Sequence, residues 1–210
     1  MGLDDDTRAA RPPGRPRNAR ADEAILTAAI DLLLERGVSQ VSVEQVARLA
    51  GVTRATVYRR FPNLTALLVG AIEWEYRDAD DAAPDWPDVE AMVASWAAQL
   101  GSPRDRKLMR RLYATVDDYP ELLQAYADAR GHRGAESVRA TLDRARRDGR
   151  LPSHVDPVVL QQILGGAALL YVSVHPDTSG EDAIEAYFTD VLRQAGYRPA
   201  AAHEGVQDDD

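Results

Sequence analysis

Hydrogen-bonding side chains gather between Thr53 and Arg60, at the spacing of one short helix. An α-helix fits the major groove of B-form DNA, where its first residues reach the edges of the bases. Arg54 could form a two-pronged hydrogen bond with a guanine, and Thr56 could donate or accept a hydrogen bond. Ala55 could contact a thymine methyl group. This stretch therefore has the side chains needed to recognise bases.

Neighbouring groups suit the phosphate backbone, which positions a protein without reading sequence. Tyr58 and Arg60 offer a hydroxyl and a cation, and backbone amides are free at a helix start near Thr53. Upstream, the cationic segment Gly14-Arg15-Pro16-Arg17 is expected to be extended, as an arm in the minor groove would be. The candidate DNA contacts are Arg15, Arg17, Ser42, Thr53, Arg54, Ala55, Thr56, Tyr58, Arg59 and Arg60.

Three short helices must hold these side chains. Apolar residues at helical spacing predict a first helix that ends near Gly37. Ser42 and Gln45 form a capping box that opens a second helix, which ends at Gly51. Thr53 is then expected to cap a third helix that stops before Phe61-Pro62, giving a helix-turn-helix. The simpler alternative is the edge of an ordinary helical bundle with a solvated arginine face.

The rest of the chain also predicts helices and no strands. Asn63 can cap a fourth helix, and a linker rich in Asp, Ala and Pro follows at 78–87. Further helical patterns follow that linker, so we expect an all-α fold of about nine or ten helices. The later helices are expected near residues 88–100, 103–116, 120–131, 135–147, 157–174 and 181–195.

Charge is divided unevenly along the 210 residues, whose formal net charge is -9. Residues 7–60 carry ten Arg against five Asp or Glu, whereas residues 61–210 carry 15 Lys or Arg against 26 Asp or Glu. Such asymmetry favours contact of the basic part with nucleic acid or a membrane surface. The acidic total therefore does not exclude a DNA partner.

Several other classes are disfavoured. The absence of Cys excludes disulfides, thiolate metal sites and cysteine nucleophiles. The four His lack the spacing of metal ligands, and no phosphate-binding loop or catalytic motif is present. The longest apolar run, Ile163 to Val174, is too short for a bilayer, and the acidic N-terminus is not a secretory signal. We expect a cytoplasmic protein without catalysis, cofactor, metal or membrane partner.

Residues 20–70 resemble the DNA-binding domain of the TetR family of bacterial transcriptional repressors. The matching text is Ala24-Ile25-Leu26, Ala28-Ala29, Gly37, Val43, Val46-Ala47, Ala50-Gly51-Val52 and Thr56-Val57-Tyr58-Arg59-Arg60-Phe61-Pro62. The family commonly has His where Arg60 stands, and arginine keeps the capacity to bind phosphate. It often has Lys where Leu64 stands, so that phosphate contact is missing here, although amides capped by Asn63 could face a phosphate.

The resemblance implies a C-terminal domain that binds a small molecule and dimerises. Its apolar and aromatic residues supply the candidate ligand contacts Trp74, Trp96, Met109, Leu112, Tyr113, Val116, Tyr126 and Tyr171. An ordinary hydrophobic core is the alternative for each of these residues. The last two helices would form a four-helix interface with a second copy, through Leu160, Ile163, Leu164, Ala167, Tyr187, Phe188 and Val191.

The sequence thus predicts a homodimeric, ligand-responsive repressor that binds a palindromic DNA operator and leaves it when an unidentified small molecule binds. The expected parts are a basic arm (1–19), a helix-turn-helix domain (20–66), a ligand-binding and dimerisation domain (67–198) and an acidic tail (199–210). The alternative is a helical binding or adaptor protein that retains the domain without regulating transcription.

Overall fold

The computed structural model describes residues 16–77, 84–129, 132–175 and 177–199. Within these ranges all regular elements are helices, which confirms the predicted all-α class. They are α1 (Pro16–Arg36), a 3₁₀ turn η1 (Val38–Gln40), α2 (Val43–Leu49), α3 (Arg54–Tyr58), α4 (Leu64–Glu75), α5 (Val89–Gly101), α6 (Pro103–Tyr113), α7 (Pro120–Ala129), α8 (His132–Arg147), α9 (Pro157–Val174) and α10 (Glu181–Gln194).

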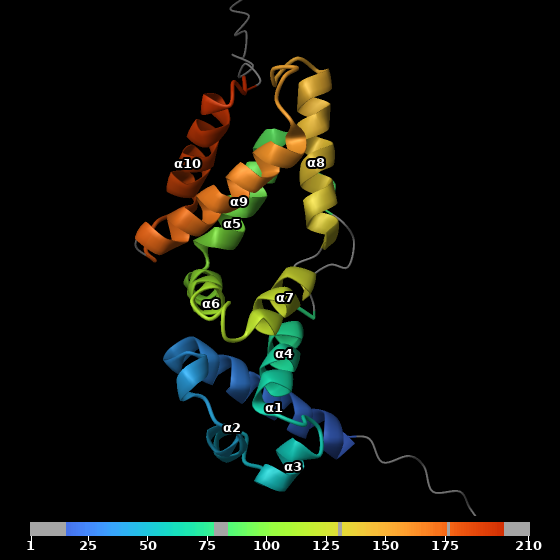
Figure 1. Ribbon diagram of the computed structural model, residues 1–210, viewed down its shortest axis with the longest axis vertical. Helices are drawn as coiled ribbons and strands as arrows, with labels where there is room; N and C mark the ends of the chain where they lie inside the picture. The colour runs from blue at the N-terminus through green and yellow to red at the C-terminus, as the bar shows by residue number, and fades with distance from the viewer. Residues whose placement is uncertain (1–15, 78–83, 130–131, 176, 200–210) are drawn as a thin grey trace, which may run out of the picture.

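The helices form an elongated molecule with two ends (Figure 1). Helices α1 to α4 make up one end, where α2 and α3 lie farthest from the rest of the chain. Helices α5, α8, α9 and α10 form the other end, and α6 and α7 lie between the two. The long axis therefore separates the candidate DNA contacts from the last two helices.

Helix α1 begins earlier than its apolar pattern predicts. The arm was expected to extend to residue 19, but residues 16–19 are helical. A proline is compatible with the first turn of a helix, where its missing N–H leaves no hydrogen bond unmade. Arg17 therefore lies in the first turn of α1, whereas Arg15 lies outside the described residues.

The first hydrophobic core joins the helix-turn-helix to the middle of the molecule. Ile25, Leu33, Val46 and Val57 are fully buried in it, together with residues of α4, α6 and α7. The expected boundary between residues 66 and 67 falls inside α4, whose Leu67 and Leu68 are both fully buried. Helix α4 therefore belongs to the same core as the helix-turn-helix and continues beyond the expected boundary.

The second core holds α5, α8, α9 and α10 together. Met92, Leu142, Val172 and Phe188 are fully buried within it. Helix α9 begins with an Asp156 cap and a first-turn proline, as the sequence predicts. Because this helix is apolar nearly all round, the second core covers only part of it, and the remaining apolar side chains face outward.

Candidate DNA interface and candidate ligand cavity

A tight turn aims α3 away from the rest of the protein. Gly51 occupies the turn with φ of +65°, a conformation that glycine adopts more readily than other residues. The Val52 amide then donates to the carbonyl of Ala47, which is itself buried. Val57 is fully buried in the first core, so one side of α3 is fixed against α2 while the opposite side faces solvent.

The solvent side of α3 carries the residues expected to contact DNA. Arg54, Ala55 and Arg59 are exposed, and Tyr58 is 46% exposed. They belong to α3, which lies at one tip of the molecule (Figure 1). A duplex could approach this surface without displacing any part of the described chain.

Arg54 forms an ion pair with Glu44 of α2, at 2.6 Å between Nη2 and Oε1. Both side chains are at least half exposed. Exposed pairs of this kind contribute only about 0–1 kcal/mol. The guanidinium can therefore exchange its carboxylate partner for a base or a phosphate at little cost.

Arg60 has a different environment from the one its sequence position suggests. Its side chain is only 14% exposed and pairs with Asp22 of α1. Its Nη1 also donates to the Thr56 carbonyl at 3.0 Å. Arg60 therefore joins α3 to α1, whereas the sequence predicts a phosphate contact for it. A partner 38 positions away cannot be identified from the local motif.

Two hydroxyl residues of the interface, Ser42 and Thr53, cap helices. Ser42 Oγ accepts from the Gln45 amide, and Gln45 Oε1 accepts from the Ser42 amide, which is the predicted capping box. Thr53 Oγ1 accepts from the Thr56 amide at 3.2 Å and lies 2.9 Å from Thr56 Oγ1. These bonds fix the starts of α2 and α3.

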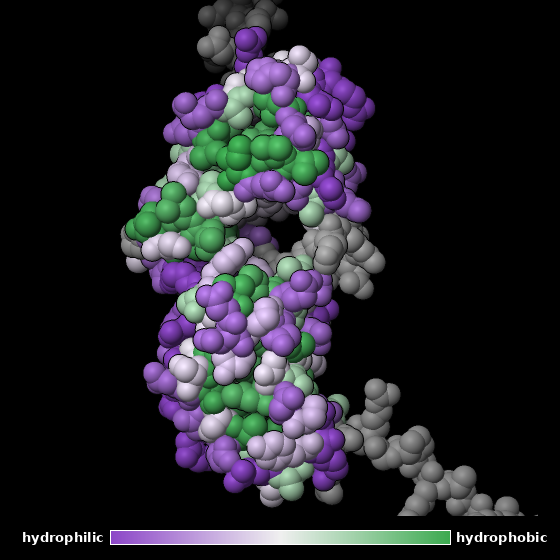
Figure 2. Space-filling view, in the orientation of Figure 1, coloured by the Kyte–Doolittle hydropathy of each residue, from purple (hydrophilic) through white to green (hydrophobic). Residues whose placement is uncertain are grey.

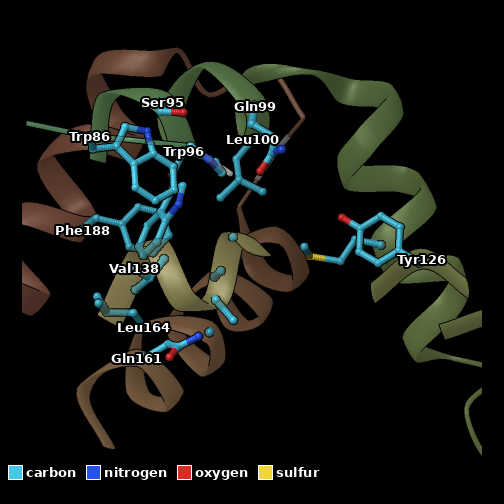
Figure 3. A pocket seen from close by; sticks show the side chains of 16 residues that line it. Trp86, Ser95, Trp96, Gln99, Leu100, Tyr126, Val138, Gln161, Leu164 and Phe188 are labelled. Atoms are coloured by element: carbon cyan, nitrogen blue, oxygen red, sulfur yellow. The ribbon is translucent and has the colours of Figure 1, made fainter. Parts of the chain in front are cut away.

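A cavity of about 490 Å³ lies among α5, α6, α7, α8, α9 and α10. Of the eight predicted ligand contacts, Trp96, Met109 and Tyr126 line it. Figure 3 shows Trp86, Trp96 and Phe188 at one side of this cavity and Tyr126 at the other. Its size and mostly apolar wall are typical of small-molecule sites.

The other five predicted ligand contacts lie outside the cavity wall. Leu112 is fully buried in the first core, and Trp74 lies beneath the guanidinium of Arg77 at 3.6 Å. Tyr113 and Val116 are about 40% exposed near the end of α6. Tyr171 is buried and stacks on His175 with ring centroids 4.0 Å apart. Helical spacing identifies the apolar positions of a helix. It does not predict whether each of them lines the cavity or packs in a hydrophobic core.

Several cavity residues were absent from the predicted set. Trp86 precedes α5 in a segment without helical spacing, where an aromatic residue among prolines was the only signal. Phe188 was expected at a dimer interface, yet it is fully buried and lines the cavity. Gln99 and Gln161 are polar residues of the cavity wall, and no sequence motif indicates either of them.

An apolar surface runs along the outside of α9. It consists of Val159, Ile163, Leu170 and Val174, each more than half exposed, and we call it the α9 face. Figure 2 shows apolar side chains gathered over α9 on this side of the molecule. Among the predicted dimer contacts, only Ile163 belongs to this face.

The remaining predicted dimer contacts are partly or fully buried. Leu160, Leu164 and Phe188 are at most 2% exposed and pack within the subunit, while Ala167 and Val191 are half-buried. Tyr187 is also half-buried, and its hydroxyl donates to the Ala167 carbonyl at 3.2 Å. These contacts join α9 and α10 into one unit beneath the exposed face.

Helix α9 has the bounds that the sequence predicts, Pro157–Val174, and so extends beyond the longest apolar run of the chain. The run begins at Ile163, but the helix begins at Pro157 and spans 18 residues with mean hydropathy 1.6. By length and composition alone it could cross a membrane, whereas the apolar run had been judged too short. Residues 157–162 add to the helix because Asp156 caps it one turn and a half earlier.

Helix α6 connects the two ends of the molecule. Arg104 bonds to Glu75 and Asp31, and Arg111 donates to the carbonyls of Leu34 and Glu35. The approach of Arg111 is close: a Cβ at Gly37 would lie 3.1 Å from its guanidinium. The hydrogen bonds that Arg104 donates to Glu75 and Asp31 raise the pKa of its guanidinium above the ordinary value.

The same helix also reaches the loop after α9. Arg110 donates to the Val172 carbonyl and to Asp177, both at 2.8 Å. The hydrogen bond from Arg110 lowers the pKa of Asp177. The fully buried Arg106 donates to carbonyls of Leu100 and Ser179. Since Met109 of α6 lines the cavity, one helix contacts the cavity, α1 and the α9–α10 loop.

Comparisons with known families agree with this architecture. Residues 25–71 match the family described as bacterial regulatory proteins, tetR family. Residues 86–191 match a domain described as tetracyclin repressor-like, C-terminal domain. The two matches together cover both ends of the molecule.

Individual relatives are similar over most of their length. The chain is 24% identical to the transcriptional regulator YdeS of Bacillus subtilis, over 92% of this chain and 98% of the relative. It is 29% identical to the regulator AqdR of Rhodococcus erythropolis, over 75% of this chain and 76% of that protein.

Solved structures share the fold. NalD, the secondary repressor of the MexAB-OprM multidrug efflux pump in Pseudomonas aeruginosa, matches with a TM-score of 0.61 at 23% identity, over 84% of this chain and 96% of that one. SmeT, the repressor of the Stenotrophomonas maltophilia efflux pump SmeDEF, matches with a TM-score of 0.63 at 22% identity, over 86% and 91%.

Proposed function

The chain belongs to the TetR family of bacterial transcriptional regulators, and on this premise we propose that it is a cytoplasmic, homodimeric repressor. In this proposal two copies of α3 bind a palindromic DNA operator, and a small molecule in the cavity releases them. The fold neighbours NalD and SmeT are both described as repressors, which supports repression over activation.

The exposed side of α3 is the observation that carries this proposal. Arg54, Ala55, Tyr58 and Arg59 face solvent together at one tip, while Val57 anchors the helix from behind. Arg54 and Ala55 belong to the first turn, which reaches base edges when a recognition helix enters the major groove. Tyr58 and Arg59 follow on the next turn, where phosphates lie.

The α9 face supports assembly into a homodimer. Monomeric proteins rarely expose a row of large aliphatic side chains such as Val159, Ile163, Leu170 and Val174. A two-fold axis through this face would make the surface self-complementary. Two heads related by such an axis would bind half-sites in adjacent turns of the duplex or in multiples of one turn, hence a palindrome.

Helix α6 offers a physical route from the cavity to the DNA-binding end. A ligand in contact with Met109 would bias the position of α6, and Arg104 and Arg111 would pass this bias to α1. The ligand need only bind the DNA-free arrangement more tightly than the DNA-bound one. Release therefore requires no contact between ligand and DNA.

Selection of bound sequences from random duplexes, combined with measurement of mass in solution, tests the proposal. We expect a dimer that enriches a palindromic sequence, with an affinity that falls steeply as salt concentration rises. A monomer that enriches no sequence would overturn the proposal and favour a helical binding or adaptor protein.

A further inference from the structure

The cavity has an aromatic end whose rings hold one another in place. Trp96 and Phe188 meet edge to face with centroids 5.5 Å apart, and Phe188 meets Tyr187 in the same way. Trp86 lies beside them in Figure 3, and its carbonyl accepts a 2.6 Å hydrogen bond from Arg144. This end therefore offers fixed aromatic surfaces against which another ring could stack.

Two glutamines lie on different walls of the cavity. Figure 3 shows Gln99 on the wall formed by α5 and Gln161 on the wall formed by α9. Neither side-chain amide is hydrogen-bonded to another residue in the described part of the chain. Each amide can both donate and accept, so the pair matches neutral polar groups such as a carbonyl, hydroxyl or amide.

The described side chains of the cavity wall carry no formal charge. The nearby guanidinium of Arg144 bonds to the Trp86 carbonyl, and that of Arg106 bonds to the Leu100 carbonyl. A charged ligand would lose water without gaining a counter-ion from this wall. The attraction between a cation and an aromatic ring offsets only part of the lost hydration energy. The wall therefore favours a neutral molecule over a cation or an anion.

Gly165 leaves room on the α9 side of the cavity. A Cβ at this position would have no neighbouring atom within 4 Å. The helix accepts the propensity cost of glycine here, and the space remains open to a ligand. A larger side chain at Gly165 would occupy that space.

We propose that the cavity binds an uncharged aromatic molecule whose rings lie between Trp86, Trp96 and Phe188 and whose polar groups meet Gln99 and Gln161. The role of that molecule as the releasing ligand rests on the function proposed above. The class is defined by ring stacking and neutral hydrogen bonding, without ion pairing.

Three naphthalene probes of equal ring size test the proposal by calorimetry on the full-length protein without DNA. They are 2-naphthamide, which is neutral, 2-naphthoate, which is an anion, and 2-naphthylmethylammonium, which is a cation at pH 7. We expect 2-naphthamide to bind with a Kd about tenfold or more below that of either ion. Equal or tighter binding of an ion overturns the proposal, as does failure of the neutral probe to bind.

Variants locate the binding to this cavity. Gln161→Glu should reverse the preference, so that the cation binds more tightly than 2-naphthamide, because the new carboxylate supplies a counter-ion. Gln40→Glu makes the same chemical change on an exposed residue of the DNA-binding end and should leave the preference unaltered. Gly165→Leu should weaken binding of 2-naphthamide about tenfold by filling the open space.

If Gln161→Glu and Gly165→Leu bind all three probes like the original protein while their circular dichroism is unchanged, the cavity is not the site and the proposal fails. Binding is measured without DNA, so its failure is separate from failure of the proposed function. A protein that prefers 2-naphthamide but enriches no duplex would refute DNA regulation and leave the ligand preference standing.

Discussion

Arg104 of α6 donates a 3.0 Å hydrogen bond from Nη2 to Oδ1 of Asp31 in α1, across 73 positions of the sequence. The same guanidinium bonds to Glu75 of α4. Helix α6 is therefore tied to two helices of the DNA-binding end while its Met109 contacts the cavity. A shift of α6 toward or away from the cavity must be matched by α1 or must break this network.

Arg104→Ala should therefore weaken communication between the cavity and DNA. Since the Arg104 side chain is 46% exposed, the loss of unfolding free energy should be small, about 0.5–1 kcal/mol. We expect the operator Kd with ligand, divided by the operator Kd without ligand, to be smaller in the variant. This decrease should exceed any change in the operator Kd measured without ligand. Arg193→Ala removes an exposed pair with Asp190 on α10 and serves as the control. An unchanged ratio in Arg104→Ala would rule out this route.

Arg59 and Arg60 are adjacent but should respond differently to replacement by alanine. Arg60→Ala removes the partly buried link to Asp22 and should cost about 1–3 kcal/mol of unfolding free energy. Arg59→Ala alters an exposed side chain and should change stability by less than about 0.5 kcal/mol. It should weaken DNA binding and reduce the slope of log affinity against log salt by about 1. Urea unfolding and binding titrations at several salt concentrations separate the two effects.

Ile163→Glu should dissociate the proposed dimer, because it places a charge at the middle of the α9 face. Sedimentation of the variant should give the mass of one chain, and operator binding should fall because two heads no longer bind together. Val116→Glu introduces the same charge at an exposed aliphatic residue outside the α9 face, and this variant should remain dimeric. A dimeric Ile163→Glu would place the interface elsewhere.

The ion pair between Arg110 and Asp177 should make stability depend on acid pH. The folded protein lowers the pKa of Asp177, so the pair stabilises the native state above the ordinary Asp pKa of about 4. This contribution is lost as the pH falls through the lowered value. Because Asp177 is 43% exposed, we expect Asp177→Asn to cost about 0.5 kcal/mol at pH 7. The difference in unfolding free energy between the two proteins, measured by urea titration, should shrink as the pH falls below the ordinary Asp pKa, and a constant difference across pH would contradict the assignment.

The local sequence predicts the helix ends well. Ser42, Thr53 and Asn63 each accept the hydrogen bond expected of a cap, because capping depends on residues within one turn. Gly37 and Gly51 both have positive φ where the predicted helices end. The set of α3 side chains available to contact bases is likewise a local property. It depends on which residues of a short helix face away from Val57.

Tertiary partners are not local, and the sequence does not predict them. The ion pair with Asp22 holds the Arg60 side chain away from solvent, and no motif around Arg60 indicates this partner. The periodicity of α9 also does not predict which side of the helix faces the core, because both sides are apolar. Leu160 and Leu164 pack inward and Ile163 faces outward, a difference that only the neighbouring helices decide.

The binding of duplex DNA by a variant with both Arg54→Ala and Tyr58→Ala tests the central claim most directly. A control with Arg193→Ala and Tyr113→Ala changes the same residue types at exposed positions away from α3. Titration of both proteins against the selected duplex should show a loss of about 100-fold or more for the first and little change for the second. Unaltered affinity in a folded Arg54→Ala, Tyr58→Ala protein would contradict recognition of DNA by α3.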